Sequence, residues 1–84
     1  MTVKTQPNIL VVDDELSMRE LLEFLLSREG YKVDLAENGR KAINMLDQHS
    51  YDLLLCDIKL GDMTGLDVLK ASKTKHPDTT VIMI

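Results

Sequence analysis

The sequence has few of the features that mark secreted, disulfide-stabilised or membrane-spanning proteins. Its 84 residues include one cysteine, two prolines and no tryptophan. The single cysteine, Cys56, excludes an internal disulfide and gives no sign of an oxidising compartment. No apolar run approaches the ~20 residues needed to cross a bilayer, and residues 1–8 lack the hydrophobic region of a signal peptide. We therefore expect a cytoplasmic protein that does not insert into a membrane.

Positive charge is also scarce. The 10 Lys and Arg residues are outnumbered by 14 Asp and Glu residues, which gives a net charge of −4. An acidic chain does not attract nucleic acid by its own electrostatics, so we expect any DNA-binding output domain to lie outside this sequence. The length suits one small domain, which we expect over residues 9–84 after a polar leader at residues 1–8.

Four short apolar segments predict β-strands. The runs Ile9–Val12 and Leu53–Cys56 have no polar alternation, which is typical of parallel strands covered on both faces. Residues 31–36 alternate between polar and apolar and predict an edge strand. The expected strands are Ile9–Val12, Tyr31–Ala36, Tyr51–Asp57 and Thr79–Ile84.

The three segments between these strands have helical periodicity. The first helix is expected to open at Asp14 or Glu15 and to end at Gly30, a left-handed cap. The second follows a turn at residues 38–39, and the third ends before Pro77. The predicted buried faces are, in chain order, Met18, Leu21, Leu22, Leu25 and Leu26; Ala42, Ile43, Met45 and Leu46; and Leu66, Val68, Leu69 and Ala71.

The alternation of strands and helices with short connections predicts the fold class. Such a chain forms a parallel sheet with right-handed crossovers and helices on both faces. We expect an α/β fold of the flavodoxin-like kind, with three layers and the strand order 2-1-3-4. In this order the strands that precede Asp13 and Asp57 are neighbours.

Acidic residues follow two of the predicted buried strands. Asp57 comes directly after Leu53–Cys56, and Asp13 and Asp14 come directly after Ile9–Val12. Open α/β sheets bind their ligands at the carboxyl ends of the strands, so these three acids should share one pocket. Carboxylates repel one another by up to ~4 kcal/mol per pair at 4 Å and an effective dielectric near 20. The pattern therefore indicates a site that holds a cation.

Several motifs together give the chain a clear resemblance to the receiver domain of bacterial two-component response regulators. Each motif is weak alone, but their order and spacing match the family over residues 9–84. The motifs are Leu-Val-Val-Asp-Asp-Glu at 10–15, Ala-Glu-Asn-Gly at 36–39 with Ala42, Asp-Ile-Lys-Leu at 57–60, and Met-Thr-Gly-Leu at 63–66.

The resemblance implies a function and a set of site residues. It implies that Asp57 is the phosphoacceptor, which takes a phosphoryl group from the phosphohistidine of a sensor histidine kinase. It also implies that Mg²⁺ is held by Asp13, Asp14 and Asp57 together with the main-chain carbonyl of Lys59. A hard, octahedral ion with carboxylate ligands suits phosphoryl transfer. A domain of this kind is a signalling module that assists its own phosphorylation, not an enzyme.

The chain differs from the family pattern in two respects. Gly61 stands where the family usually has proline, so we expect a less rigid loop. We also expect residues 9–84 to correspond to the first two-thirds of the family's domain. We expect these residues to lack the family's fifth strand and last two helices, the Ser or Thr after the fourth strand and the lysine after the fifth. An exposed fourth strand favours self-association.

Two other functions compete with the receiver interpretation. A Mg²⁺-dependent aspartyl-phosphate phosphatase or phosphotransferase would also use a strand-end aspartate, but haloacid-dehalogenase-like enzymes carry Asp-x-Asp, and here Ile58 and Lys59 follow Asp57. A chemically inactive interaction domain is the other alternative, which the intact acids disfavour. More ordinary roles are helix capping for Asp13 or Asp14 and simple exposure for the Lys59 side chain.

Overall fold

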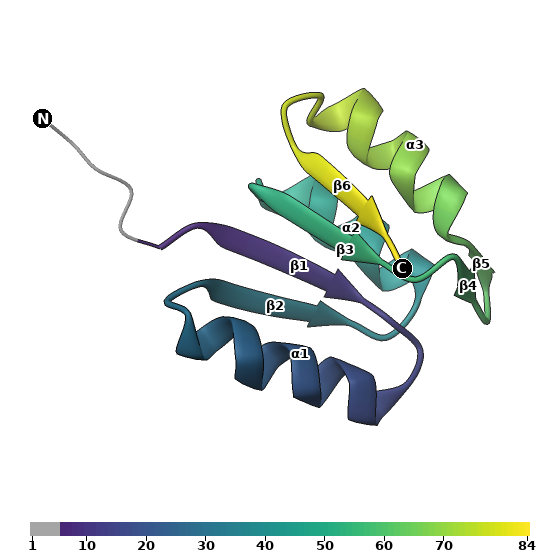
Figure 1. Cartoon of the computed structure of the whole chain (residues 1–84). Coiled ribbons are helices and arrows are strands. Elements are labelled where there is room, and N and C mark those ends of the chain that lie inside the picture. Colours follow the sequence, from purple (N-terminus) through teal and green to yellow (C-terminus); the bar gives the residue numbers. More distant parts are fainter. Residues whose placement is uncertain (1–5) are drawn as a thin grey trace, which may run out of the picture.

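The structure is a computed structural model that describes residues 6–84 (Figure 1). Most of the leader expected at residues 1–8 therefore lies outside the described residues, and Asn8 already belongs to the first strand. The main sheet is parallel and has the order β2-β1-β3-β6. Its strands are β1 (Asn8–Val12), β2 (Lys32–Ala36), β3 (Leu53–Cys56) and β6 (Thr80–Met83). The predicted α/β class and strand order 2-1-3-4 are confirmed, with β6 as the fourth strand.

The direction of each crossover decides which face each helix covers. The chain moves from β1 to β2 in one direction across the sheet and from β2 to β3 to β6 in the other. Right-handed connections therefore place α1 (Leu16–Arg28) on one face, and α2 (Gly39–Gln48) and α3 (Gly65–Lys75) on the opposite face. Figure 1 shows α1 beside β2 and α2 behind the sheet.

The core lies between the sheet and the two helices α2 and α3. Residues that point to this face from the central strands, such as Leu10 and Leu54, have no solvent exposure. Ala42 and Leu46 of α2 are equally buried, as the helical spacing predicted. The cluster comprises Leu10, Val12, Ala36, Ala42, Leu46, Tyr51, Leu54, Cys56, Leu60 and Val68. Burying these side chains contributes about 1.5–3 kcal/mol for each large one and fixes β1 beside β3.

The other face of the sheet is only partly covered, and the predicted burial of the α1 stripe was wrong. Within the described residues α1 contacts mainly β2 and β1, at one side of the sheet. Leu21 and Leu25 are 50% and 43% exposed, and Met18 is also exposed, while Leu22 and Leu26 are half-buried. Ile82 of β6 is 46% exposed. Periodicity identified the apolar stripe correctly, but nothing in residues 6–84 packs over much of it.

Two predicted helix details need correction. Helix α1 begins at Leu16 with Glu15 as its N-cap residue, which agrees with the opening expected at Asp14 or Glu15, but neither Asp13 nor Asp14 caps it. In α3 the buried line runs through Gly65, Val68 and Ser72, and Leu66 is 56% exposed. Gly65, the first residue of α3, lies against the Asp57 carbonyl, so the helix face that contains Gly65 is turned inward. Leu66, the next residue around the helix, is therefore turned outward.

Local turn chemistry agrees better with the sequence. Gly30 has φ of 92°, which confirms the left-handed residue after α1. Asn38 is the N-cap of α2, and its side chain accepts a hydrogen bond from the Lys41 N–H at 2.8 Å. The loop after β3 holds a hairpin that the sequence did not predict, made of β4 (Lys59–Leu60) and β5 (Met63–Thr64). Among residues 6–84, no helix is long and apolar enough to cross a bilayer.

Candidate functional site

The register of β1 and β3 brings two of the predicted acids to the same edge of the sheet. Val12 pairs with Cys56 at the ends of these strands. The next residue on each strand is an aspartate, Asp13 and Asp57, and the Asp57 N–H donates to the Val12 carbonyl at 2.9 Å. Both acids therefore lie at the carboxyl end of the sheet, where the sequence placed them.

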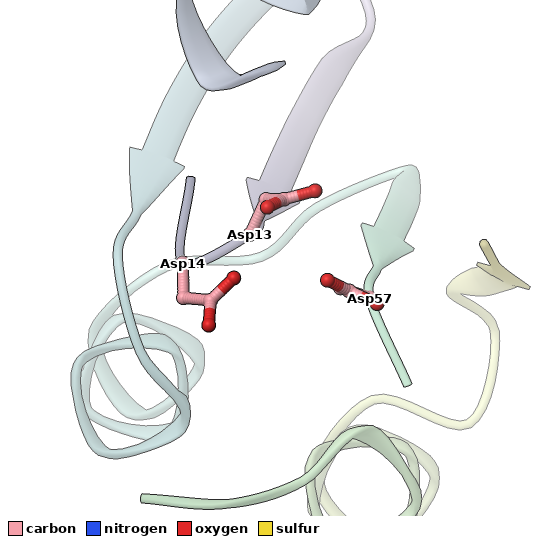
Figure 2. Close-up of side chains that lie close together, drawn as sticks. All are labelled: Asp13, Asp14 and Asp57. Carbon is pink, nitrogen blue, oxygen red and sulfur yellow. The ribbon is translucent and has the colours of Figure 1, made fainter. Parts of the chain in front are cut away.

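The three predicted carboxylates form one cluster. Asp13, Asp14 and Asp57 each offer an oxygen, and these oxygens lie within 4.8 Å of one another. Asp13 is buried, Asp57 is half-buried and Asp14 is exposed. Figure 2 shows the three side chains around a common space between the two strand ends. Their negative charges gather in a partly desolvated place, which favours a compensating cation.

Asp13 is held from two sides. Its Oδ1 atom accepts a hydrogen bond from the Glu15 N–H at 2.9 Å. Its main-chain carbonyl accepts one from Nη1 of Arg19 at 2.8 Å. Arg19 was not predicted to belong to the site; the only available signal was its place one helical turn after the acidic strand end. Its guanidinium brings a positive charge next to the cluster and fixes the start of α1 beside it.

The Asp57 carboxylate contacts the hairpin that follows it. Its Oδ1 atom accepts a hydrogen bond from the Lys59 N–H at 3.3 Å. The Lys59 side chain is exposed, as expected, and the role of its carbonyl as a metal ligand stays a prediction. The start of α3 lies very close to Asp57: a Cβ atom on Gly65 would clash with the Asp57 carbonyl oxygen. The Gly65 N–H donates to the Ile58 carbonyl at 2.6 Å. Glycine is therefore needed at this position.

Asp62 is a second contact that sequence reasoning missed. Its two carboxylate oxygens accept hydrogen bonds from the N–H groups of Gly39 and Arg40, both at 2.9 Å. These bonds lower the pKa of Asp62 below its ordinary value, the one from Gly39 first. No sequence signal links residues 22 and 23 positions apart, so only the folded chain shows this contact.

Comparison with known proteins now identifies the family. Residues 9–84 match the response regulator receiver domain family. The chain belongs to this family. The receiver domain is 42% identical over 79 residues to the transcriptional regulatory protein ZraR of Klebsiella oxytoca, covering 94% of this chain and 18% of that protein. It is 43% identical over 76 residues to the transcriptional regulatory protein CpxR of Escherichia coli K12, covering 90% of this chain and 32% of that protein. The chain thus spans less than a third of either relative.

Solved structures share the fold of this receiver domain. The response regulator TrrA from Thermotoga maritima, crystallised in complex with Mg²⁺-BeF, is 41% identical with a TM-score of 0.88. That match covers 93% of this chain and 68% of the TrrA chain. A second crystal structure, of the histidine kinase ThkA in complex with TrrA, matches at 41% identity with a TM-score of 0.85, covering 93% and 67% of the two chains.

The donor set of this receiver domain fits a magnesium ion. Magnesium binds oxygen ligands at 2.0–2.1 Å, so oxygens on opposite sides of the ion are about 4.2 Å apart. Adjacent oxygens of an octahedral magnesium ion are about 2.9 Å apart, so the oxygens of Asp13, Asp14 and Asp57, which lie within 4.8 Å of one another, would be drawn together around a bound ion. The exposed position of Asp14 leaves room for waters, which magnesium retains.

Cys56 takes no part in this chemistry. It is fully buried in the core. Burial, together with the nearby negative charges of Asp57 and Asp13, raises the pKa of its thiol to about 11. The side chain is therefore a neutral thiol at physiological pH, and thiolate nucleophilic chemistry at this residue is excluded.

Proposed function

We propose that this receiver domain accepts a phosphoryl group on Asp57 from the phosphohistidine of a sensor histidine kinase. Asp13, Asp14, Asp57 and the Lys59 carbonyl would hold the Mg²⁺ ion. The observation that carries the proposal is the cluster of three carboxylates within 4.8 Å at the ends of β1 and β3. Of these, Asp57 alone ends the central strand β3 and lies beside the acid pair, which suits it to act as the nucleophile.

The residues of the chain have separate roles in this transfer. An Asp57 oxygen attacks phosphorus, the P–O bond forms as the P–N bond breaks, and the leaving imidazole keeps the electron pair and takes up a proton. The Lys59 N–H binds Oδ1 and thereby orients the carboxylate. The bonds from Glu15 and Arg19 fix Asp13 so that its carboxylate faces the same space. The bound metal would neutralise charge on the transferring group.

The relatives support the same chemistry. TrrA was crystallised with Mg²⁺-BeF and with the histidine kinase ThkA. Both statements concern TrrA, and they agree with the acid cluster found independently in this chain. We extend them to this receiver domain and propose that it is cytoplasmic, has a histidine kinase as its partner and binds Mg²⁺.

Intact mass after incubation with acetyl phosphate and MgCl₂ separates this proposal from its alternatives. A stable gain of one phosphoryl group supports the receiver function. Release of inorganic phosphate without a mass gain would favour the aspartyl-phosphate phosphatase or phosphotransferase, although no Asp-x-Asp partner follows Asp57. No gain in mass and no release of inorganic phosphate, with or without Mg²⁺, would favour an inactive interaction domain.

We further propose that an output domain accompanies the receiver domain in the whole protein. ZraR and CpxR are transcriptional regulatory proteins of which this chain matches 18% and 32%. Their remaining length supports a DNA-binding output, which the net charge of −4 disfavours for these 84 residues themselves. A gel-shift comparison of the whole protein with this chain tests the assignment, because only the whole protein should bind DNA.

Self-association of this chain through β6 is a separate proposal. In the described residues β6 pairs with β3 on one side and forms an edge of the sheet on the other. Ile82 and Ile84 are 46% and 50% exposed there. An apolar strand with open backbone groups pairs readily with another chain. Light scattering over a range of concentrations should show a rising mass, and a concentration-independent monomer would contradict it.

A further inference from the structure

The β4–β5 hairpin lies between the acceptor strand and α3, and it is tied to α2. Asp62 at its turn accepts hydrogen bonds from the N–H groups of Gly39 and Arg40, one on each carboxylate oxygen and both at 2.9 Å. The next residue, Met63, packs so tightly on Gly39 that a Cβ atom there would overlap its side chain. Two consecutive hairpin residues therefore attach to the first turn of α2.

The start of α2 has its own local cap. Asn38 accepts a hydrogen bond from the Lys41 N–H at 2.8 Å, as an N-cap residue should. Asp62 binds the N–H groups of Gly39 and Arg40, which lie between Asn38 and Lys41. It comes from a segment more than 20 positions away. The two caps thus act on the same helix end, but only the one from Asp62 also restrains the hairpin.

The hairpin has little rigidity of its own. Its ladder has two residue pairs, Lys59 with Thr64 and Leu60 with Met63. A two-stranded ribbon of this size is not stable alone. The turn residue Gly61 has no positive φ, and a Cβ atom there would meet no atom within 4 Å, so the space beside the turn is open. The position of the hairpin therefore depends on its attachments.

We infer that Asp62 is a positioning residue: by anchoring the β4–β5 hairpin on α2, it holds the main chain at Lys59 in place beside Asp57. The link is short, because Asp62 adjoins Met63, Met63 pairs with Leu60, and Leu60 adjoins Lys59. The Lys59 N–H already contacts the Asp57 carboxylate at 3.3 Å. This inference rests on the proposed function, in which the Lys59 carbonyl is a metal ligand.

A purely structural role for Asp62 would be that of a second helix cap. The variants Asp62→Ala and Asn38→Ala separate the two roles, because each removes a cap from the same end of α2 and only the first releases the hairpin. Both should lower the melting temperature. Only Asp62→Ala should raise the Mg²⁺ dissociation constant, by about fivefold, somewhat less than is typical for direct outer-shell partners of a ligand. Amide NMR with MgCl₂ as the titrant measures the constant.

Amide exchange in the metal-free chain gives a readout independent of Mg²⁺. Asp62→Ala should speed exchange at residues 59–64, whereas Asn38→Ala should affect α2 alone. Unchanged hairpin exchange, a Mg²⁺ constant within twofold of the wild type, or equal weakening by Asn38→Ala would each overturn the inference. Absence of Mg²⁺ binding in the wild type would instead overturn the proposed function, and hairpin exchange would still decide whether Asp62 anchors this segment.

A rescue variant tests the mechanism directly. Gly61 has no positive φ, which proline could not adopt, and its Cβ position is open, so proline can be placed there to stiffen the turn. The double variant Gly61→Pro/Asp62→Ala should recover at least half of the lost Mg²⁺ affinity. A double variant as weak as Asp62→Ala alone would contradict the stiffening role.

Discussion

Neutralising Asp14 should have opposite effects on stability with and without magnesium. In the metal-free chain its carboxylate lies within 4.8 Å of oxygens on both Asp13 and Asp57. The substitution Asp14→Asn keeps the shape of the side chain and removes both repulsions. Asp14 is exposed and is not the N-cap residue of α1, so the substitution should change little else in the structure.

The expected magnitude follows from the distances. One pair of charges 4.8 Å apart repels by ~0.9 kcal/mol in water and by ~3.5 kcal/mol at an effective dielectric of 20. Asp14 is exposed, so the total for its two pairs should lie near the lower limit, at about 1–2 kcal/mol. For a domain of this size that stabilisation raises the melting temperature by about 4–16 °C.

The assay is thermal unfolding with chelator and with MgCl₂. In chelator, Asp14→Asn should melt above the wild type. At a Mg²⁺ concentration tenfold above its dissociation constant, the wild type should gain ~1.4 kcal/mol, and the variant, which has lost a ligand, should gain much less. Asp78→Asn is the matched control, because Asp78 is an exposed acid in the turn before β6, at the opposite end of the sheet. Equal Mg²⁺ gains in wild type and variant, or a lower melting point of Asp14→Asn in chelator, would refute the carboxylate cluster as the binding site.

Three further predictions concern the scaffold. Gly65→Ala should cost about 1–3 kcal/mol and weaken Mg²⁺ binding, because its Cβ atom clashes with the acceptor residue, whereas Gly61→Ala meets open space; equal urea midpoints would contradict this. Tyr51→Phe should cost about 1–3 kcal/mol in urea unfolding, because the hydroxyl donates to Asp34 at 2.7 Å, and a neutral substitution would show that this bond is dispensable. The folded pKa of Asp62 is lowered below 3.8, so its contribution to stability is present above that pH and is lost as the pH falls through the folded pKa; wild type should therefore lose more stability than Asp62→Asn between about pH 5 and about pH 3.

The sheet and the acid cluster could be predicted because their signals are local and strong. The uninterrupted apolar runs before Asp13 and Asp57 determined two buried parallel strands, and parallel register then required the acids to meet. The strand order 2-1-3-4 came from the likeness of the strand and helix pattern to flavodoxin-like folds, whose crossovers are right-handed. Neither the strands nor the meeting of the acids depends on the details of side-chain packing.

The burial of α1 and α3 could not be predicted in the same way. Periodicity shows which face of a helix is apolar, but not how much of that face a neighbour covers. Leu21 and Leu25 therefore lie on the correct stripe and remain exposed. In α3, Ser72 is fully buried and Leu66 is exposed, because the helix face that contains Gly65 is the one turned inward. Sequence patterns place a helix start only to within a few residues.

The contacts that shape the loop around the site were also beyond sequence reasoning. Asp62 binds N–H groups that only the folded topology brings near, and Arg19 reaches the Asp13 carbonyl from the next helix. Hairpin strands of two residues carry no periodicity. Such features arise from tertiary placement, which propensity and pattern do not encode.

Borohydride trapping of the phosphorylated chain, followed by peptide mapping, tests the central claim most directly. Acetyl phosphate and MgCl₂ supply the phosphoryl group and the metal, and reduction marks the aspartyl phosphate. The account predicts a label on Asp57 alone, its loss in Asp57→Asn, and strong dependence on Mg²⁺. A label on Asp13 or Asp62, or an undiminished label in Asp57→Asn, would contradict it.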